Sequence, residues 1–110
     1  MKATITLIEL KNPFKFFPLS LYAMRILGQL KTTNCVEMKK KGIWTRHYTM
    51  TLWNSEKDLK DFYKSGAHLE AMKKTPKVAK EIRTLTIDAN ELPDWDTAIK
   101  MLEKCKVLRF

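Results

Sequence analysis

The segment from Arg46 to Met72 constrains the fold more than any other part of the chain, because strand-like alternation changes there to helical spacing. Between Ile43 and Trp53, apolar and aromatic residues occupy both sets of alternate positions. In an extended strand these two sets point to opposite faces of a sheet. The pattern therefore predicts a strand that is partly buried on both sides, and both faces of its sheet need cover.

A helix is predicted directly after this strand. Ser55 can accept a hydrogen bond from a backbone N–H of the first turn, and Glu56 and Asp58 suit the positive end of the helix dipole. Apolar or small residues then follow at the spacing of one helical face: Leu59, Phe62, Tyr63 and Gly66. We expect this helix to break at Gly66, since glycine suits the left-handed conformation in which helices end.

The same stretch resembles a known family through six residues: Leu52, Trp53, Ser55, Leu59, Phe62 and His68. A strand ends in an apolar residue and Trp, a polar residue and Ser follow, and an amphipathic helix has a His near its end. In this it is similar to the dimeric α/β-barrel superfamily, which includes the cofactor-free antibiotic-biosynthesis monooxygenases. It most resembles the spheroidene-monooxygenase-like branch, whose Gly-x-His is matched by Gly66, Ala67 and His68. The detailed match covers about the middle quarter of the chain and bears on fold more than on chemistry.

The composition is that of a globular protein, with 110 residues of which 45% are hydrophobic. This length suits a single domain over residues 1–110, with a C-terminal helical extension from about residue 94. The chain opens with no cleavable apolar segment and has no uninterrupted membrane-spanning run, so we expect a soluble cytoplasmic protein without a membrane partner. Cys35 and Cys105 lack metal-site spacing and are expected to be free thiols, and no metal site is expected.

The other elements follow from alternation, helical spacing and turn residues. Strands are predicted at Ala3–Leu10, Thr33–Lys39 and Ile82–Ala89, and helices at Phe17–Leu30, Ala67–Lys74 and from Asp94 to about Lys104. Pro76 is expected to begin a turn, and the run Lys39–Gly42 is interpreted as the solvated turn of a hairpin. The apolar tail Val107–Phe110 is expected to dock on a sheet edge or on a partner.

The order strand, helix, strand, strand, helix, strand is the split βαβ unit. It predicts an α+β, ferredoxin-like fold, in which a four-stranded antiparallel sheet carries both main helices on one face and a C-terminal helix follows. The other face would be bare, although the strand from Ile43 to Trp53 needs cover on both sides. In the resembled superfamily two copies close their sheets into a dimeric α/β barrel, so the resemblance implies a homodimer.

His68 is the candidate catalytic residue. Imidazole transfers protons near neutral pH, and a break at Gly66 would turn His68 inward from the helix side opposite Leu59. The alternative is a structural imidazole that bonds a backbone carbonyl. The resemblance also allows haem ligation through His68, and haem is the one cofactor considered; otherwise no cofactor is expected.

Five further residues are candidates for substrate binding: Trp53, Tyr22, Tyr63, Arg46 and His47. Trp53 matches an aromatic position that lines the substrate cavity of the monooxygenase relatives, and packing at the strand end is its alternative role. Tyr22 and Tyr63 lie on the apolar stripes of the two main helices, where they can face a cavity or pack in the core. Arg46 and His47 can bind an acidic group or be solvated strand residues.

The expected function is binding of a small apolar or aromatic molecule between sheet and helices, with monooxygenase-like oxidation as the implied transformation. Three alternatives stay open: a dimeric binding or structural protein without catalysis, a haem-binding protein, and a basic nucleic-acid-binding module. The net charge of +9 favours the last. However, the strand around Tyr48 lacks the Lys/Arg-Gly-aromatic pattern of RNA-recognition domains, so nucleic acid is not the expected partner.

Overall fold

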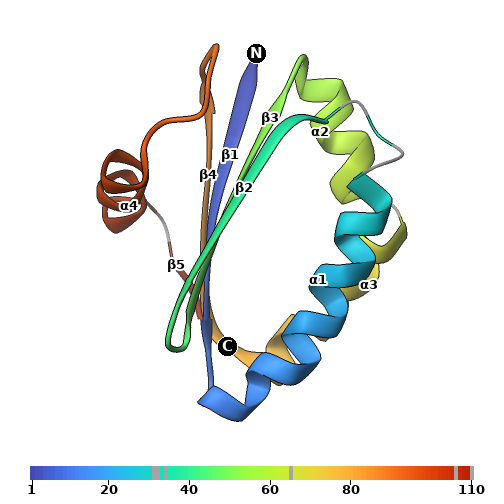
Figure 1. The fold of residues 1–110 in the computed structure, drawn as a ribbon, viewed down its shortest axis with the longest axis vertical. Coiled ribbons are helices and arrows are strands. Elements are labelled where there is room, and N and C mark those ends of the chain that lie inside the picture. Colours follow the sequence, from blue (N-terminus) through green and yellow to red (C-terminus); the bar gives the residue numbers. More distant parts are fainter. Residues whose placement is uncertain (31–32, 34, 65, 106, 110) are drawn as a thin grey trace.

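The computed structural model describes residues 1–30, 33, 35–64, 66–105 and 107–109. It places one sheet between two layers of helices, with α4 on one side and α1, α2 and α3 on the other (Figure 1). The strands are β1 (Lys2–Leu10), β2 (Cys35–Ile43), β3 (Arg46–Trp53), β4 (Ala79–Asp88) and β5 (Val107–Arg109). The helices are η1, a 3-10 turn (Pro13–Lys15), α1 (Phe16–Leu30), α2 (Glu56–Tyr63), α3 (Gly66–Val78) and α4 (Trp95–Glu103).

The sheet has the strand order β2-β3-β1-β4-β5, and every neighbouring pair is antiparallel. At its centre Ile5 lies opposite Met50 of β3 and Leu85 of β4. The first four strands with α1, α2 and α3 confirm the predicted α+β, ferredoxin-like fold. β5 pairs with residues 81–83 in the first half of β4, which confirms that the tail docks on a sheet edge.

α4 covers one face of this sheet. The alternation of β1 sends Ala3, Ile5 and Leu7 to that face, where all three are buried. They form one cluster with Ala98 and Leu102 of α4 and with side chains from β3 and β4. The apolar face of the sheet, which was expected to be covered by a second copy, is therefore covered by α4 of the same chain. The homodimer stays a prediction.

The lysine run lies in a strand, so its interpretation as a hairpin turn was wrong. Lys39, Lys40 and Lys41 belong to β2 and lie opposite Met50, Thr49 and Tyr48, while the turn is formed by Trp44 and Thr45. β2 is an edge strand, and lysines are well tolerated there because their long side chains reach solvent and discourage pairing with other chains. Three consecutive lysines show no strand-like alternation, and Gly42 favoured a turn, so the turn was predicted too early in the sequence.

The helices after β3 begin as predicted. Ser55 caps α2 by accepting a hydrogen bond from the backbone N–H of Asp58 at 3.2 Å. A second helix follows the break, but it extends to Val78 and includes Pro76, where a turn had been expected. Its end is fixed by the chain after β1, since the N–H of Lys11 donates to the carbonyl of Val78 at 3.0 Å. None of the helices in the described ranges is long and apolar enough to cross a membrane.

Trp44 has a backbone φ of 55°, in the left-handed region that costs an L-residue with a Cβ about 1 kcal/mol or more. We predict that Trp44→Asn raises the free energy of unfolding by about 1 kcal/mol, since Asn adopts this conformation more readily and the Trp side chain is 79% exposed. Chemical denaturation of the two proteins measures the difference. An unchanged or lower stability of the variant would show that the indole makes a compensating contact.

Candidate functional site

The sheet face toward α1 and α3 is lined by hydroxyl groups. Six threonines from β1, β3 and β4 form it, and we call them the threonine face: Thr4, Thr6, Thr49, Thr51, Thr84 and Thr86. The hydroxyls of Thr4 and Thr86 lie 3.1 Å apart, and those of Thr6 and Thr84 lie 3.0 Å apart. Thr49, Thr84 and Thr86 are exposed although α1 and α3 lie on this side of the sheet (Figure 1). The face is therefore accessible to solvent, and it offers mainly hydroxyl groups, with Lys40 of β2 opposite Thr49 at its edge.

Trp53 packs at one end of the threonine face. It is fully buried in a cluster with Leu59 and Phe62, and its ring centroid lies 5.1 Å from that of Phe62. Its indole N–H donates to the hydroxyl of Thr51 at 2.9 Å. Because the only polar group of Trp53 is used inside the protein, Trp53 shapes this end by its surface and has no donor left for a ligand.

His47 lies at the other end of the same face, next to the strand turn. Its ring stacks on Phe16 of α1 with centroids 5.5 Å apart. A Cβ on Gly42, the residue opposite His47, would meet Nδ1 of His47 at 3.0 Å, so only a residue without a side chain leaves room for the ring. Nε2 of His47 is buried and has no hydrogen-bond partner among the described residues. Burial lowers the pKa of His47 below 6.5, which favours the neutral imidazole.

The two tyrosines and His68 differ in how the structure places them. Tyr22 of α1 is half-buried, with Nζ of Lys74 at 5.7 Å from its ring centre. Tyr63 packs against the cluster around Trp53. The side chain of His68 lies outside the described part of the chain, so its predicted inward turn stays a prediction.

Arg46 is not part of this face, although it precedes His47 directly. It points to the α4 side, where it lines a cavity of about 240 Å³. The cavity lies between the sheet and the end of α4, and its lining residues are Leu7, Arg46, Tyr48, Glu81, Arg83, Ile99, Leu102 and Glu103. The structure thus separates Arg46 from Trp53 and His47, which sequence reasoning had grouped as one set.

The charges around this cavity are balanced by one another. Glu9 lies 3.8 Å from Arg46 and 3.6 Å from Lys80, and Glu81 lies 3.8 Å from Arg83 and 3.6 Å from Arg109. Partial burial opposes ionisation of Glu9, but contacts with Glu81 and the two cations outweigh it and lower its pKa. Nη1 of Arg83 also donates to the carbonyl of Leu102 at 3.2 Å, at the end of α4. These groups hold α4 and β5 on the sheet, so we place the candidate site on the threonine face.

The threonine face could have been recognised in the sequence. Thr-x-Thr occurs three times, as Thr4 and Thr6, Thr49 and Thr51, and Thr84 and Thr86, each inside a predicted strand. The repeated pattern predicts a hydroxyl-lined row on each strand. Only the register of the strands shows that the three rows lie side by side.

The depressed pKa of His47 predicts a pH-dependent stability. The unfolded state binds a proton near pH 6.5, whereas the folded state resists it, so this contribution is present above pH 6.5 and is lost as the pH falls below it. We expect the thermal midpoint of the protein to fall between about pH 7 and pH 5, and the fall to be smaller in His47→Gln. Equal slopes in the two proteins would contradict a buried neutral imidazole.

The fold is shared by solved structures of low sequence identity. Rv0793 of Mycobacterium tuberculosis matches with a TM-score of 0.71 and 11% identity over 84% of this chain and 98% of that one. A structure described as an antibiotic biosynthesis monooxygenase matches with a TM-score of 0.71 and 12% identity, over 84% of this chain and 100% of its own. A variant of SnoaB, a cofactor-independent oxygenase from Streptomyces nogalater, has a TM-score of 0.66 and 8% identity, with coverages of 84% and 97%.

No protein-family model matches the chain, and no curated protein matches it either. TM-scores of 0.66 to 0.71 establish a common fold, while identities of 8% to 12% leave the reaction undetermined. The structural matches confirm the ferredoxin-like fold of antibiotic-biosynthesis-monooxygenase type that the resemblance implied. The closer likeness to the spheroidene-monooxygenase branch is not addressed by them. This chain therefore has the fold of these monooxygenases.

Proposed function

We propose that the protein binds a small aromatic or apolar molecule along the threonine face and oxidises it with dioxygen. The observation that carries the proposal is an accessible row of hydroxyls between two aromatic ends, Trp53 with Phe62 and His47 with Phe16. The likeness to a cofactor-independent oxygenase supports an oxidation that needs no cofactor.

The chemistry of the face favours a flat molecule with hydroxyl or carbonyl groups. Threonine hydroxyls both donate and accept hydrogen bonds, and they carry no charge that would require a charged ligand. At the His47 end, the ring of Phe16 is 47% exposed and offers an edge or face contact to a ring system, whereas Trp53 and Phe62 are buried and close the opposite end. A phenolic aromatic molecule combines these features. Arg46 and Arg83 lie on the other face, and Lys40, opposite Thr49, supplies a cation at the edge of this one.

Proton removal is the step that the protein would assist. A phenol that gives up its O–H proton becomes an electron-rich phenolate, and the ring carbon para to the oxygen can then add dioxygen. The resulting hydroperoxide loses water and leaves a quinone, so one oxygen atom enters the product and the other leaves in water. His47 is proposed as the base because its imidazole is held neutral and Nε2 has no hydrogen-bond partner among the described residues; Nε2 is buried, so it must be uncovered before it can accept the proton.

His68 is kept as a second candidate base, carried by the resemblance alone. Trp53 is proposed to shape the end of the site from behind, since its ring is fully buried, and Tyr22 and Tyr63 are proposed to line the helix side. Arg46 is left out of this site because it lies on the α4 face. These roles are proposals, and the substitutions described below test the face to which they belong.

Filling the threonine face should block binding. We predict that Thr84→Phe weakens the binding of a dihydroxynaphthalene about tenfold or more, because a phenyl group would occupy the accessible face. The variant should fold, since Thr84 is exposed and phenylalanine suits a strand. Isothermal titration calorimetry measures affinity, and an oxygen electrode measures dioxygen consumption without added metal or flavin.

Thr97→Phe is the matched control, because Thr97 is also an exposed threonine but lies on α4, beyond the other face of the sheet. Binding should be unchanged in this variant. Equal binding by the two variants would remove the threonine face as the site. Binding without dioxygen consumption in the wild-type protein would reduce the proposal to a binding protein.

The homodimer implied by the resemblance is also proposed. Because α4 already covers the apolar face of the sheet, pairing would use surface that α4 leaves free. Size-exclusion chromatography with light scattering at micromolar concentration should give a mass of about twice 12.9 kDa. A single species at 12.9 kDa would contradict the dimer.

A further inference from the structure

We propose that the end of the molecule formed by η1 and the β2–β3 turn docks on the surface of an anionic lipid bilayer. We call this region the basic end, and it consists of Lys11, Phe14, Lys15, Phe17, Lys40, Lys41, Trp44 and Lys77. The inference rests on these residues alone and does not require the proposed oxidation.

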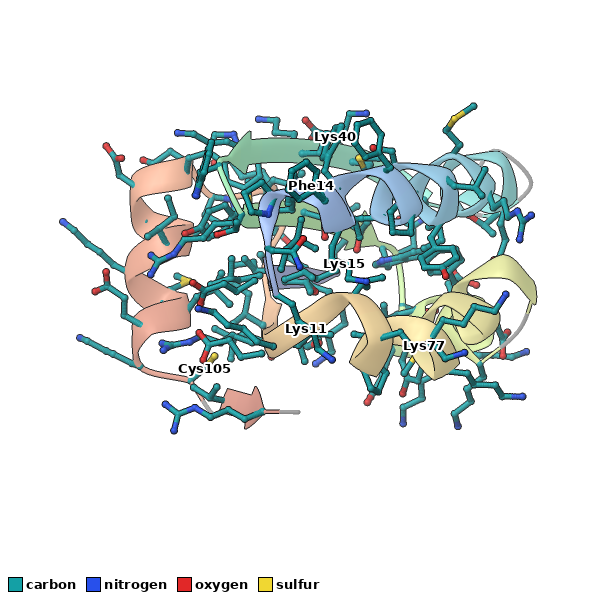
Figure 2. The ribbon with its side chains drawn as sticks, turned by 90° about the horizontal axis from the view of Figure 1, so that it is seen from below. Lys11, Phe14, Lys15, Lys40, Lys77 and Cys105 are labelled. Carbon is teal, nitrogen blue, oxygen red and sulfur yellow. The ribbon has the colours of Figure 1, made fainter. Side chains whose placement is uncertain are left out.

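Three separate parts of the chain meet at the basic end. The N–H of Leu10 donates to the carbonyl of Thr45 at 2.8 Å, which joins the end of β1 to the β2–β3 turn. The N–H of Lys11 donates to Val78 at 3.0 Å, which joins the same segment to the end of α3. Figure 2 looks onto this end and shows Lys11, Phe14, Lys15, Lys40 and Lys77 distributed across it. The patch is therefore one surface.

Three aromatic side chains of the basic end project into solvent. Phe14 is 78% exposed, Phe17 is 71% exposed and Trp44 is 79% exposed. Exposed aromatic groups in one region of a small protein usually mark an interaction surface. Trp44 is the most informative, because it occupies a left-handed turn position that suits Asn, Asp or Gly, and the fold gains no buried surface from it. Its exposed indole is therefore better explained by contact with a partner than by a contribution to the stability of the fold.

The lysines of the basic end are not neutralised by the protein. Within the described ranges, Lys11, Lys15, Lys40, Lys41 and Lys77 form none of the salt bridges. The acids nearest to these lysines along the chain are already paired with other cations: Glu9 with Arg46 and Lys80, Glu37 with Lys39, and Glu81 with Arg83 and Arg109. The basic end therefore presents uncompensated positive charge around exposed aromatic rings, and this charge complements an anionic surface.

A bilayer fits this combination better than a second copy or a nucleic acid. Two basic ends of the same chain would repel each other. Nucleic acids stack their bases on aromatic rings that share a platform, whereas Phe14, Phe17 and Trp44 come from a 3-10 turn, a helix and a hairpin tip. Trp and Phe partition into the interface of a bilayer, and each lysine near anionic headgroups adds attraction. The expectation of no membrane partner rested on the lack of a spanning segment, which surface binding does not need.

Vesicle binding tests the proposal directly. The wild-type protein should cosediment with phosphatidylcholine vesicles that contain phosphatidylglycerol and not with pure phosphatidylcholine vesicles. Its tryptophan emission should shift to shorter wavelength on the anionic vesicles, and the shift should be absent in Trp44→Asn, since Trp53 is buried and Trp95 is partly buried against the core cluster under α4. Equal binding to both kinds of vesicle, or binding to neither, would overturn the proposal.

Matched charge variants separate the basic end from net charge. Lys11→Gln with Lys15→Gln should lower the partition coefficient about tenfold or more. Lys57→Gln with Lys64→Gln removes the same charge from α2 and its C-cap at the opposite end of the molecule, and it should change binding much less (Figure 1). Equal losses in the two double variants would contradict a localised surface. Tighter binding to single-stranded RNA than to anionic vesicles at physiological salt would assign the surface to nucleic acid instead.

Discussion

The packing of α4 on the sheet decides how the two faces of this protein are used. β1 alternates strictly, so Ala3, Ile5 and Leu7 meet α4 while the hydroxyls of Thr4 and Thr6 point the other way. Burial of the apolar face by Leu102 and Ala98 supplies a core that does not depend on α1. Because the face of the sheet toward α1 and α3 is not needed for the main core, that face can remain polar and accessible. A binding face is therefore compatible with a stable fold.

Much of the fold could be predicted because its signals are local. Ser55 and Asp94 cap helices by accepting hydrogen bonds from residues three positions later, as their sequence context indicates. The lysines of β2 were wrongly predicted to form a turn, because lysines are tolerated in an edge strand as well as in a turn. Periodicity could not predict that α4 buries the apolar face of the sheet, since an amphipathic C-terminal helix and a second copy of the chain can each bury that face.

The candidate site was predictable only in part, because it depends on strand register. Arg46 and His47 are adjacent in sequence but lie on opposite faces, where one joins balanced charges and the other stacks on Phe16. Trp53 was found from its position, yet its indole N–H is already bonded to Thr51. The unpartnered Nε2 of His47 has no sequence signal, since the ring is placed by tertiary contacts, stacked on Phe16 and next to Gly42.

Phe16 connects the two surfaces to which functions are proposed here. Its ring stacks on His47 at the end of the threonine face and lies in an edge contact with Phe17 of the basic end, with centroids 6.2 Å apart. A bilayer that draws the Phe17 ring into its interface would therefore act on the side chain that covers His47. Movement of Phe16 would change the packing around His47 at the end of the site nearest the membrane. An apolar molecule dissolved in the bilayer would then meet the threonine face at its imidazole end, while the opposite end stays closed by the packing of Trp53 and Phe62.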